Sequence, residues 1–200
     1  MPFISAIARE DAATTSSTKD GYLNPNKIKS GEKVRFALLA DEPFMFFELW
    51  GHEATDPQKR KPFRFTEDPT PEDIKAKLGD THVRSLSRDG KGHEPCKIAH
   101  AVPVYNYDLE KVQILSWTQK TITQDFDGIS QLEDYADSMT KVDFFLSRKG
   151  EGTDTKYSVQ PAPRKKGMSL IISEEWESVN ELGFDLNELI KGGDPFKPGE

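Results

Sequence analysis

Between residues 97 and 163, short apolar runs alternate with short polar turns, and this order of elements limits what the chain can fold into. Two apolar runs, 97–107 and 112–119, flank the turn DLEK, and two more, 141–148 and 155–163, flank the turn KGEGTD. Residues 121–136, between the two hairpins, have the spacing of an amphipathic helix. This order predicts the second half of a five-stranded Greek-key barrel of the OB type, with one helix between strands 3 and 4.

The first strand of such a barrel must lie upstream of residue 97. Val34, Phe36 and Leu38 recur at every second position, the segment DEP at 41–43 interrupts the pattern, and FMFFELWG at 44–51 resumes it. We interpret the two runs as one bent strand or as two successive strands, because the first strand of this barrel curls through a bulge and serves both halves. The expected fold class is therefore mainly β.

The predicted helix and strands also indicate a core. Four helix residues are spaced by four, three and three positions, which places them near one helix face: Ile122, Phe126, Ile129 and Leu132. Phe36 and one ring of the neighbouring pair Phe144 and Phe145 are assigned to the core as well.

Composition changes on both sides of the predicted barrel. Residues 1–30 are polar, lack a sustained apolar period and are interpreted as a flexible arm. The barrel domain is expected at 31–163. Residues 164–200 are expected to form an acidic tail, helical or disordered, with a flexible tip at 192–200.

The segment 51–96 is interpreted as a basic, loop-rich insertion in the barrel. It is rich in Pro, Lys, Arg, Asp and Gly, and it is too long for a plain hairpin loop. One short helix is predicted at Pro71–Leu78, because Thr70 and Pro71 begin it and acidic residues occupy its first turn.

The net charge of −7 argues at first against a nucleic-acid partner. The charge is unevenly distributed, however. Residues 174–200 contain eight acidic and two basic side chains, whereas residues 1–173 contain 26 acidic and 25 basic ones. Residues 59–97 are net positive, with ten basic and seven acidic side chains. A nearly neutral body with a basic insertion and an acidic tail leaves nucleic-acid binding open.

Other classes of protein have little support in the sequence. The single cysteine, Cys96, excludes an internal disulfide and fits a reducing compartment, and the absence of an eighteen-residue apolar run predicts no membrane association. No GxxxxGK, GxSxG or HExxH motif is present. A metal-dependent nuclease needs several acids at the ends of adjoining core strands, and only Asp143 is so placed. We therefore predict that the protein is not an enzyme.

A metal site is a weaker alternative. His93, Cys96 and His100 have the spacing H-x2-C-x3-H, with His82 upstream, and zinc accepts such ligands. The pattern lacks the paired CxxC knuckle of a strong zinc motif, and His100 lies in a predicted strand where packing explains it. We expect no cofactor, with zinc as the alternative.

Proteins that bind single-stranded nucleic acid combine aromatic faces for the bases with cations for the phosphates. This chain interleaves both types along the first strand, the insertion and the two hairpins. The predicted contacts are Arg35, Trp50, Lys59, Arg60, Lys61, Phe63, Arg64, Phe65, Lys97, Tyr105, Tyr107, Lys111, Trp117, Lys156 and Tyr157. Six of the rings have basic neighbours or lie in loops and are expected on the exposed face: Trp50, Phe63, Phe65, Tyr105, Tyr107 and Trp117.

Two segments carry a resemblance to a known family. The run VPVYNYDLEKVQILSWTQKTI and the later run SRKGEGTDTKYSVQPAP resemble a group of bacteriophage single-stranded DNA-binding proteins with an OB fold. The likeness covers residues 27–163, and GEGTDTKYSV is its most specific piece. It extends to the acidic C-terminal segment that reaches GGDPF, which is similar to the acidic C-termini of replicative single-strand binders.

The resemblance implies a protein that coats and protects single-stranded DNA, without sequence preference, during phage DNA replication, recombination and repair in the cytoplasm of the host cell. It also implies that the acidic tail recruits replication or recombination proteins. Some phage relatives carry a zinc subdomain at the position of residues 52–96, a pattern from which this chain departs because it has one cysteine.

An alternative of another class is a protein-binding accessory factor or inhibitor, built on the same barrel without DNA affinity. Its acidic surface would then contact a basic partner. A metal-dependent nuclease is a third alternative, which only Asp143 supports.

Overall fold

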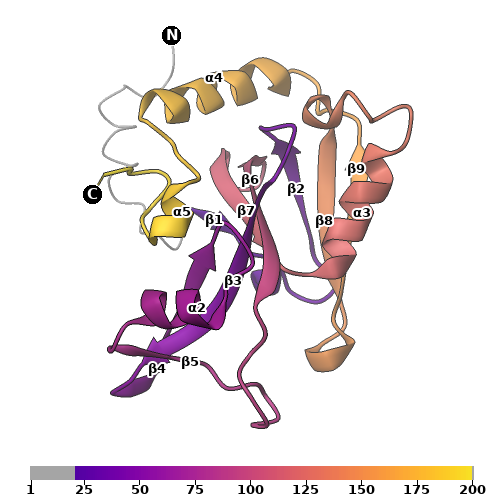
Figure 1. Ribbon diagram of the computed structural model, residues 1–200. Helices are drawn as coiled ribbons and strands as arrows, with labels where there is room; N and C mark the ends of the chain where they lie inside the picture. The colour runs from indigo at the N-terminus through magenta and orange to yellow at the C-terminus, as the bar shows by residue number, and fades with distance from the viewer. Residues whose placement is uncertain (1–20, 200) are drawn as a thin grey trace.

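A computed structural model describes residues 21–199 of the chain and shows one large β-sheet with helices on both faces (Figure 1). The strands are β1 (Tyr22–Leu23), β2 (Lys33–Leu38), β3 (Phe44–Glu53), β4 (Asp56–Phe65), β5 (His82–Arg84), β6 (Lys97–Asn106), β7 (Lys111–Trp117), β8 (Asp143–Lys149) and β9 (Lys156–Ala162). The α-helices are α2 (Pro71–Leu78), α3 (Lys120–Ser130), α4 (Met168–Glu181) and α5 (Glu188–Lys191), and short 3-10 helices are η1 (Pro25–Lys27), η2 (Met139–Lys141) and η3 (Gly152–Asp154).

The main path through the sheet is β1-β7-β6-β2-β8-β9, and β3 branches from β6 to carry β4 and β5. All the pairings are antiparallel except that of β1 with β7. Both predicted hairpins, β6–β7 and β8–β9, are present, and α3 lies between them. The mainly β class is thereby confirmed, but the path ends at β1 and β9 without closing, so a barrel is not confirmed.

The two upstream apolar runs form successive strands on one partner. Leu38 at the end of β2 lies opposite Val104, and Phe44 at the start of β3 lies opposite Ala101. Both strands therefore follow β6, and the segment containing Pro43 separates them. Of the two interpretations of these runs, the structure has two successive strands.

The main core lies between the inner face of the sheet and α3. It includes Phe36, Leu38, Val102, Val104, Leu115, Phe144 and Leu146. Three of the four predicted helix residues pack there: Ile122 and Ile129 are buried, and Phe126 packs edge to face against Phe36. Leu132 is 52% exposed because α3 ends at Ser130, shorter than expected.

The segment 51–96 is an ordered arm in which β4, α2 and β5 pack around the outer half of β3. The expected loop-rich insertion is confirmed only in part. Residues 66–70 and 85–96 lie outside the helices and strands, but β4 was not predicted because it contains Pro57, Pro62 and a run of cations. An edge strand, paired on one side only, tolerates prolines and lysines that a central strand does not. The predicted helix α2 is confirmed with its bounds, and the Thr70–Asp73 capping box begins it.

The C-terminal segment also packs on the body. Leu189 of α5 is 1% exposed and contacts the cluster that contains Phe46 and Ile114 on the outer face of the sheet. Ile172 of α4 is buried in a small cluster on the same face. The expected flexible tip is folded here, since Phe196 packs against Phe184 with ring centroids 5.1 Å apart. Figure 1 shows α4 spanning one end of the sheet and α5 close to β1 and β7.

The start of the described chain is ordered as well. Tyr22 and Leu23 pair with Ile114 and Leu115 of β7, and Ile28 is buried in the main core. This part of the expected flexible arm therefore belongs to the sheet, and residues 1–20 lie outside the described residues. Between residues 21 and 199, no helix combines the length and apolar character needed to cross a membrane.

Candidate nucleic-acid interface

The outer face of β2, β8 and β9 carries four cations and one aromatic ring. Arg35 lies opposite Phe145, Lys33 lies opposite Ser147, and Lys149 lies opposite Lys156. Alternation along the strands directs these side chains away from the core, because Phe36, Phe144, Leu146 and Val159 occupy the other face. We call Lys33, Arg35, Phe145, Lys149 and Lys156 the outer platform.

Phe145 is the aromatic centre of the outer platform. Its ring is half-buried, with Lys33 Nζ 4.5 Å and Arg35 Cζ 5.4 Å from the ring centroid. Arg35 also lies 5.2 Å from the ring of Tyr107. Cations at these distances are attracted to aromatic faces, so they order the ring while keeping positive charge beside it.

Among the residues of these three strands on the outer face of the sheet, only Asp143 has a carboxylate. Neighbouring parts of the chain bury it fully. Arg35 Nη2 lies 2.7 Å from its Oδ2, and Arg164 Nε lies 2.9 Å from its Oδ1 in an ion pair without hydrogen-bond geometry. The backbone N–H of Lys165 donates to Oδ2 at 3.0 Å. Because two guanidinium groups face one enclosed carboxylate, the outer platform keeps a net positive charge.

Tyr107 completes the surroundings of Asp143. Its hydroxyl donates to Asp143 Oδ1 at 2.8 Å. Burial, followed by this hydrogen bond, raises the pKa of Tyr107 well above its ordinary value. The phenol therefore stays protonated near neutral pH, and its ring adds a second aromatic group beside Arg35.

A second group of cations, Lys59, Arg60 and Lys61 of β4, lies on the arm, and together with Trp50 of β3 we call it the arm patch. Arg60 is beside Trp50, whereas Lys61 lies on the other face of the strand pair, with its Nζ 5.0 Å from the ring centroid of Phe63. Trp50 is 38% exposed, and Arg60 Cζ lies 5.5 Å from its ring. This arm patch is less positive than its composition indicates. Lys59 pairs with Glu53 at 3.3 Å, and Arg60 pairs with Glu94 at 2.9 Å.

Three rings expected on the exposed face are buried instead: Phe63 (7% exposed), Tyr105 (2%) and Trp117 (4%). Phe63 packs with the helix α2, and Tyr105 lies in the cluster that contains Ile172 of α4. Trp117 belongs to the main core and donates its indole N–H to Thr123 of α3 at 3.0 Å. The helices α2 and α3 follow closely in the chain and cover Phe63 and Trp117, whereas the remote helix α4 covers Tyr105. Strand alternation alone reveals none of these covers.

Other predicted contacts have structural partners. Arg64 pairs with Glu48 at 3.0 Å and donates to the carbonyl of Leu189, so it holds α5 against the arm. Phe65 is half-buried beside Lys77. Tyr157 points to the inner side, where its hydroxyl lies 2.8 Å from Asn26 Oδ1.

The structure therefore divides the predicted residues. Arg35 and Lys156 belong to the outer platform, with Tyr107 beside Arg35. Trp50 and Arg60 lie together on one face of the arm, and Lys61 lies on its other face. Lys97 is exposed at the start of β6, and Lys111 is half-buried at the start of β7.

The predicted contacts do not include Lys33, Phe145 or Lys149 of the outer platform. A signal existed for Lys33, since the inward alternation of Val34 and Phe36 implies that their neighbours face outward. For Phe145, the sequence indicated only that one ring of its pair is core, and Phe144 is that ring.

The four residues considered for zinc do not form a site. His82 packs edge to face against Phe63, whereas His100 stacks on Trp117. Within residues 21–199, no group of three or more His, Cys, Asp or Glu side chains is arranged to hold a metal ion.

The C-terminal helices leave the outer platform partly accessible. Ile172 of α4 packs at Ala37 and Tyr105, and Leu189 of α5 packs farther along the sheet at Phe46 and Ile114. Lys33, Lys149 and Lys156 are exposed. No protein-family model, curated protein or solved structure matches this chain.

Proposed function

We propose that this protein binds single-stranded DNA without sequence preference, and that the outer platform is the surface that binds it. The observation that carries the proposal is a sheet face with four cations and a half-buried ring that lies beside two of them, whose only carboxylate is enclosed by two arginines. Cations of this kind contact phosphates, and an aromatic face stacks on any base. Neither contact depends on the identity of the base, so single-stranded DNA of any sequence is expected to bind.

The finer fold proposal is an OB-type barrel that is opened along one seam. The order β7-β6-β2-β8-β9 corresponds to strands 3, 2, 1, 4 and 5 of such a barrel, with α3 between strands 3 and 4. OB barrels are often only partly closed. Here α3 packs along β9, where Asp125 accepts a hydrogen bond from the backbone N–H of Val159 at 2.7 Å. The helix thus covers the edge of β9, whose backbone groups would pair with another strand in a closed barrel.

In the cell, the proposed role is to coat and protect single-stranded DNA in phage replication, recombination and repair, in the cytoplasm of the host. The acidic C-terminal segment would recruit replication or recombination proteins. Exposed Glu174, Glu177 and Glu181 on α4 support an electrostatic role for this segment. The proposed role requires binding to DNA and to proteins and no catalytic residue.

The test is a fluorescence-anisotropy titration of labelled oligo-dT with the full-length protein at about 50 mM and about 200 mM salt. If the four platform cations contact phosphates, the slope of log K against log salt concentration is about −3, because each single-strand phosphate contributes about −0.7. Absence of binding at the lower salt concentration would contradict the proposal and favour a protein-binding accessory factor.

Two substitutions locate the site. Phe145→Ala is expected to weaken oligo-dT binding by about 1 to 3 kcal/mol through the loss of stacking, and Phe145→Trp is expected to retain it. Lys149→Ala is expected to reduce the magnitude of the salt slope by about 0.7, whereas Lys75→Ala on the exposed side of α2 leaves it unchanged. Equal affinities of wild type and Phe145→Ala would exclude the outer platform as the site.

A further inference from the structure

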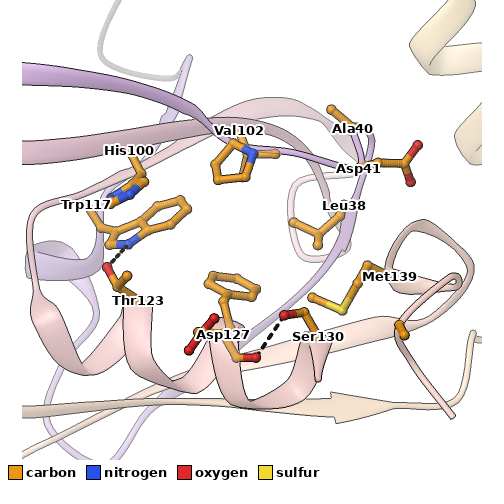
Figure 2. A pocket seen from close by; sticks show the side chains of 13 residues that line it. Leu38, Ala40, Asp41, His100, Val102, Trp117, Thr123, Asp127, Ser130 and Met139 are labelled. Carbon is orange, nitrogen blue, oxygen red and sulfur yellow. Dashed lines mark hydrogen bonds between the residues drawn. The ribbon is translucent and has the colours of Figure 1, made fainter. Parts of the chain in front are cut away.

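A cavity of about 290 Å³ lies on the opposite, inner side of the sheet (Figure 2). It is bounded by the segment that joins β2 to β3, by the adjoining ends of β6 and β7, by α3 and by the residues that follow α3. Leu38, Val102 and Trp117 of the main core form part of its wall, so the cavity is an extension of the core that reaches the surface. Its volume is near the lower end of the range for small-molecule sites.

The inner wall of the cavity is apolar and well ordered. Trp117 is held by its hydrogen bond to Thr123 and by His100, which stacks on it with centroids 5.1 Å apart and planes 15° apart. Phe126 packs against the same indole at 5.4 Å. Burial lowers the pKa of His100, so this part of the wall carries no positive charge near neutral pH. Flat apolar groups fit such a surface without requiring it to rearrange.

The charge at the cavity is negative. Asp41 and Asp127 are its two charged lining residues, and the lining includes no lysine or arginine. Both carboxylates are exposed, and each is held by a neighbour. Asp41 accepts from Thr140 Oγ1 at 3.1 Å, and Asp127 accepts from Gln131 Nε2 at 3.0 Å. The cavity therefore combines an apolar interior with two carboxylates, which disfavours a phosphate and favours a cation.

We infer that this cavity binds a small organic cation with a flat apolar body, of the arylalkylammonium class. The apolar body is buried against Trp117 and Phe126, and the ammonium group is paired with Asp127 on α3, whereas Asp41 adds negative charge at the other side of the cavity (Figure 2). The site differs from the proposed DNA interface in charge and in the face of the sheet it occupies. The inference is independent of the proposed function.

Three probes with the same ring and different head groups test the inference: phenethylamine, 2-phenylethanol and phenylacetate. Each is titrated into the ¹⁵N-labelled full-length protein, and the three tryptophan indole N–H resonances are followed. Trp117 is expected to shift with phenethylamine, less with 2-phenylethanol and not with phenylacetate. Trp50 and Trp176 lie outside the cavity lining and are expected to stay unchanged. Equal responses to the three probes, or equal shifts of all three indoles, would overturn the inference.

Two variants separate charge from shape. Asp127→Asn is expected to weaken phenethylamine binding about fivefold and to leave 2-phenylethanol binding unchanged, since one exposed ion pair contributes up to about 1 kcal/mol. Ala136→Trp places bulk at an exposed lining position and is expected to abolish the binding of both probes. Ala54→Trp, at an exposed position in the turn between β3 and β4, is the matched control. Undiminished phenethylamine binding in either Asp127→Asn or Ala136→Trp would contradict the assignment.

Discussion

A carboxylate is costly to bury, and Asp143 is accompanied by compensating partners from three remote parts of the chain. Arg35 comes from β2, Tyr107 follows β6, and Arg164 and Lys165 belong to the segment after β9. Asp143 thereby ties the last segment of the chain to the sheet. Its place at the start of a core strand could be predicted from the sequence. Its role could not, because Arg35 is 108 residues away.

Asp143→Asn is expected to lower the free energy of unfolding by roughly 3 to 5 kcal/mol, because the substitution leaves two arginines without their buried counter-charge. Urea denaturation measures the change. Asp137→Asn, at an exposed position, is the control and is expected to stay within about 0.5 kcal/mol of wild type. A loss below about 1 kcal/mol for Asp143→Asn would mean that the ion pairs contribute little.

For individual aromatic rings, the sequence does not decide which face of the sheet each ring occupies. Strand alternation identifies two faces, but the facing of Tyr105 and Trp117 depends on what covers each face. The cover of Tyr105 is Ile172 of α4, and Trp117 packs with Phe126 of α3. Phe145 was ambiguous for a related reason, and only its pairing with Arg35 assigns it to the outer side.

At the scale of elements, periodic segments were predictable and the arm was not. The hairpin strands and α2 have strong local signals, namely alternation, turn residues and a capping box. Strand β4 has none, because Lys59, Arg60 and Lys61 lie on an edge that needs no apolar face. Its pairing with β3 is determined by contacts such as Leu49 with Phe63, which sequence spacing does not reveal.

The arm depends on a close approach at Gly51. A Cβ at this position would lie 2.8 Å from Phe63 Cε2, 3.0 Å from Leu78 Cδ2 and 3.0 Å from the carbonyl oxygen of Val83. Since one of these atoms belongs to the backbone, side-chain rotation cannot relieve all three contacts. Glycine is therefore required for β4, α2 and β5 to pack together around β3.

Gly51→Ala is expected to destabilise the arm by about 1 to 3 kcal/mol through overpacking. Hydrogen exchange is expected to accelerate at amides of β4, α2 and β5 and to stay unchanged in α3 and β8. Gly92→Ala is the control, because a Cβ there meets no atom within 4 Å. If Gly51→Ala accelerated exchange across the whole sheet equally, the arm would not be a separate cooperative unit.

At the scale of the whole molecule, helices cover both faces of the sheet. The C-terminal segment is acidic, whereas the outer platform is positively charged. The sequence indicated the acidic C-terminal segment from its composition. Its packing was not predictable, because the apolar residues that reach the sheet are few and widely spaced among acidic ones. They belong to the cluster on the outer face: Phe184, Leu186, Leu189, Ile190 and Phe196.

Substitutions of two leucines test whether this segment is a packed layer of the fold or a free tail. Leu189 is 1% exposed against Phe46, Ala99, Ala101 and Ile114, whereas Leu182 is 73% exposed. Leu189→Ala is expected to lower the free energy of unfolding by about 2 to 5 kcal/mol, because it removes buried methyl groups and leaves a cavity. Leu182→Ala removes the same atoms from solvent-exposed positions and is expected to change the free energy of unfolding by less than about 0.5 kcal/mol. Equal urea midpoints for the two variants would mean that the segment contributes no stability and acts only as a tether.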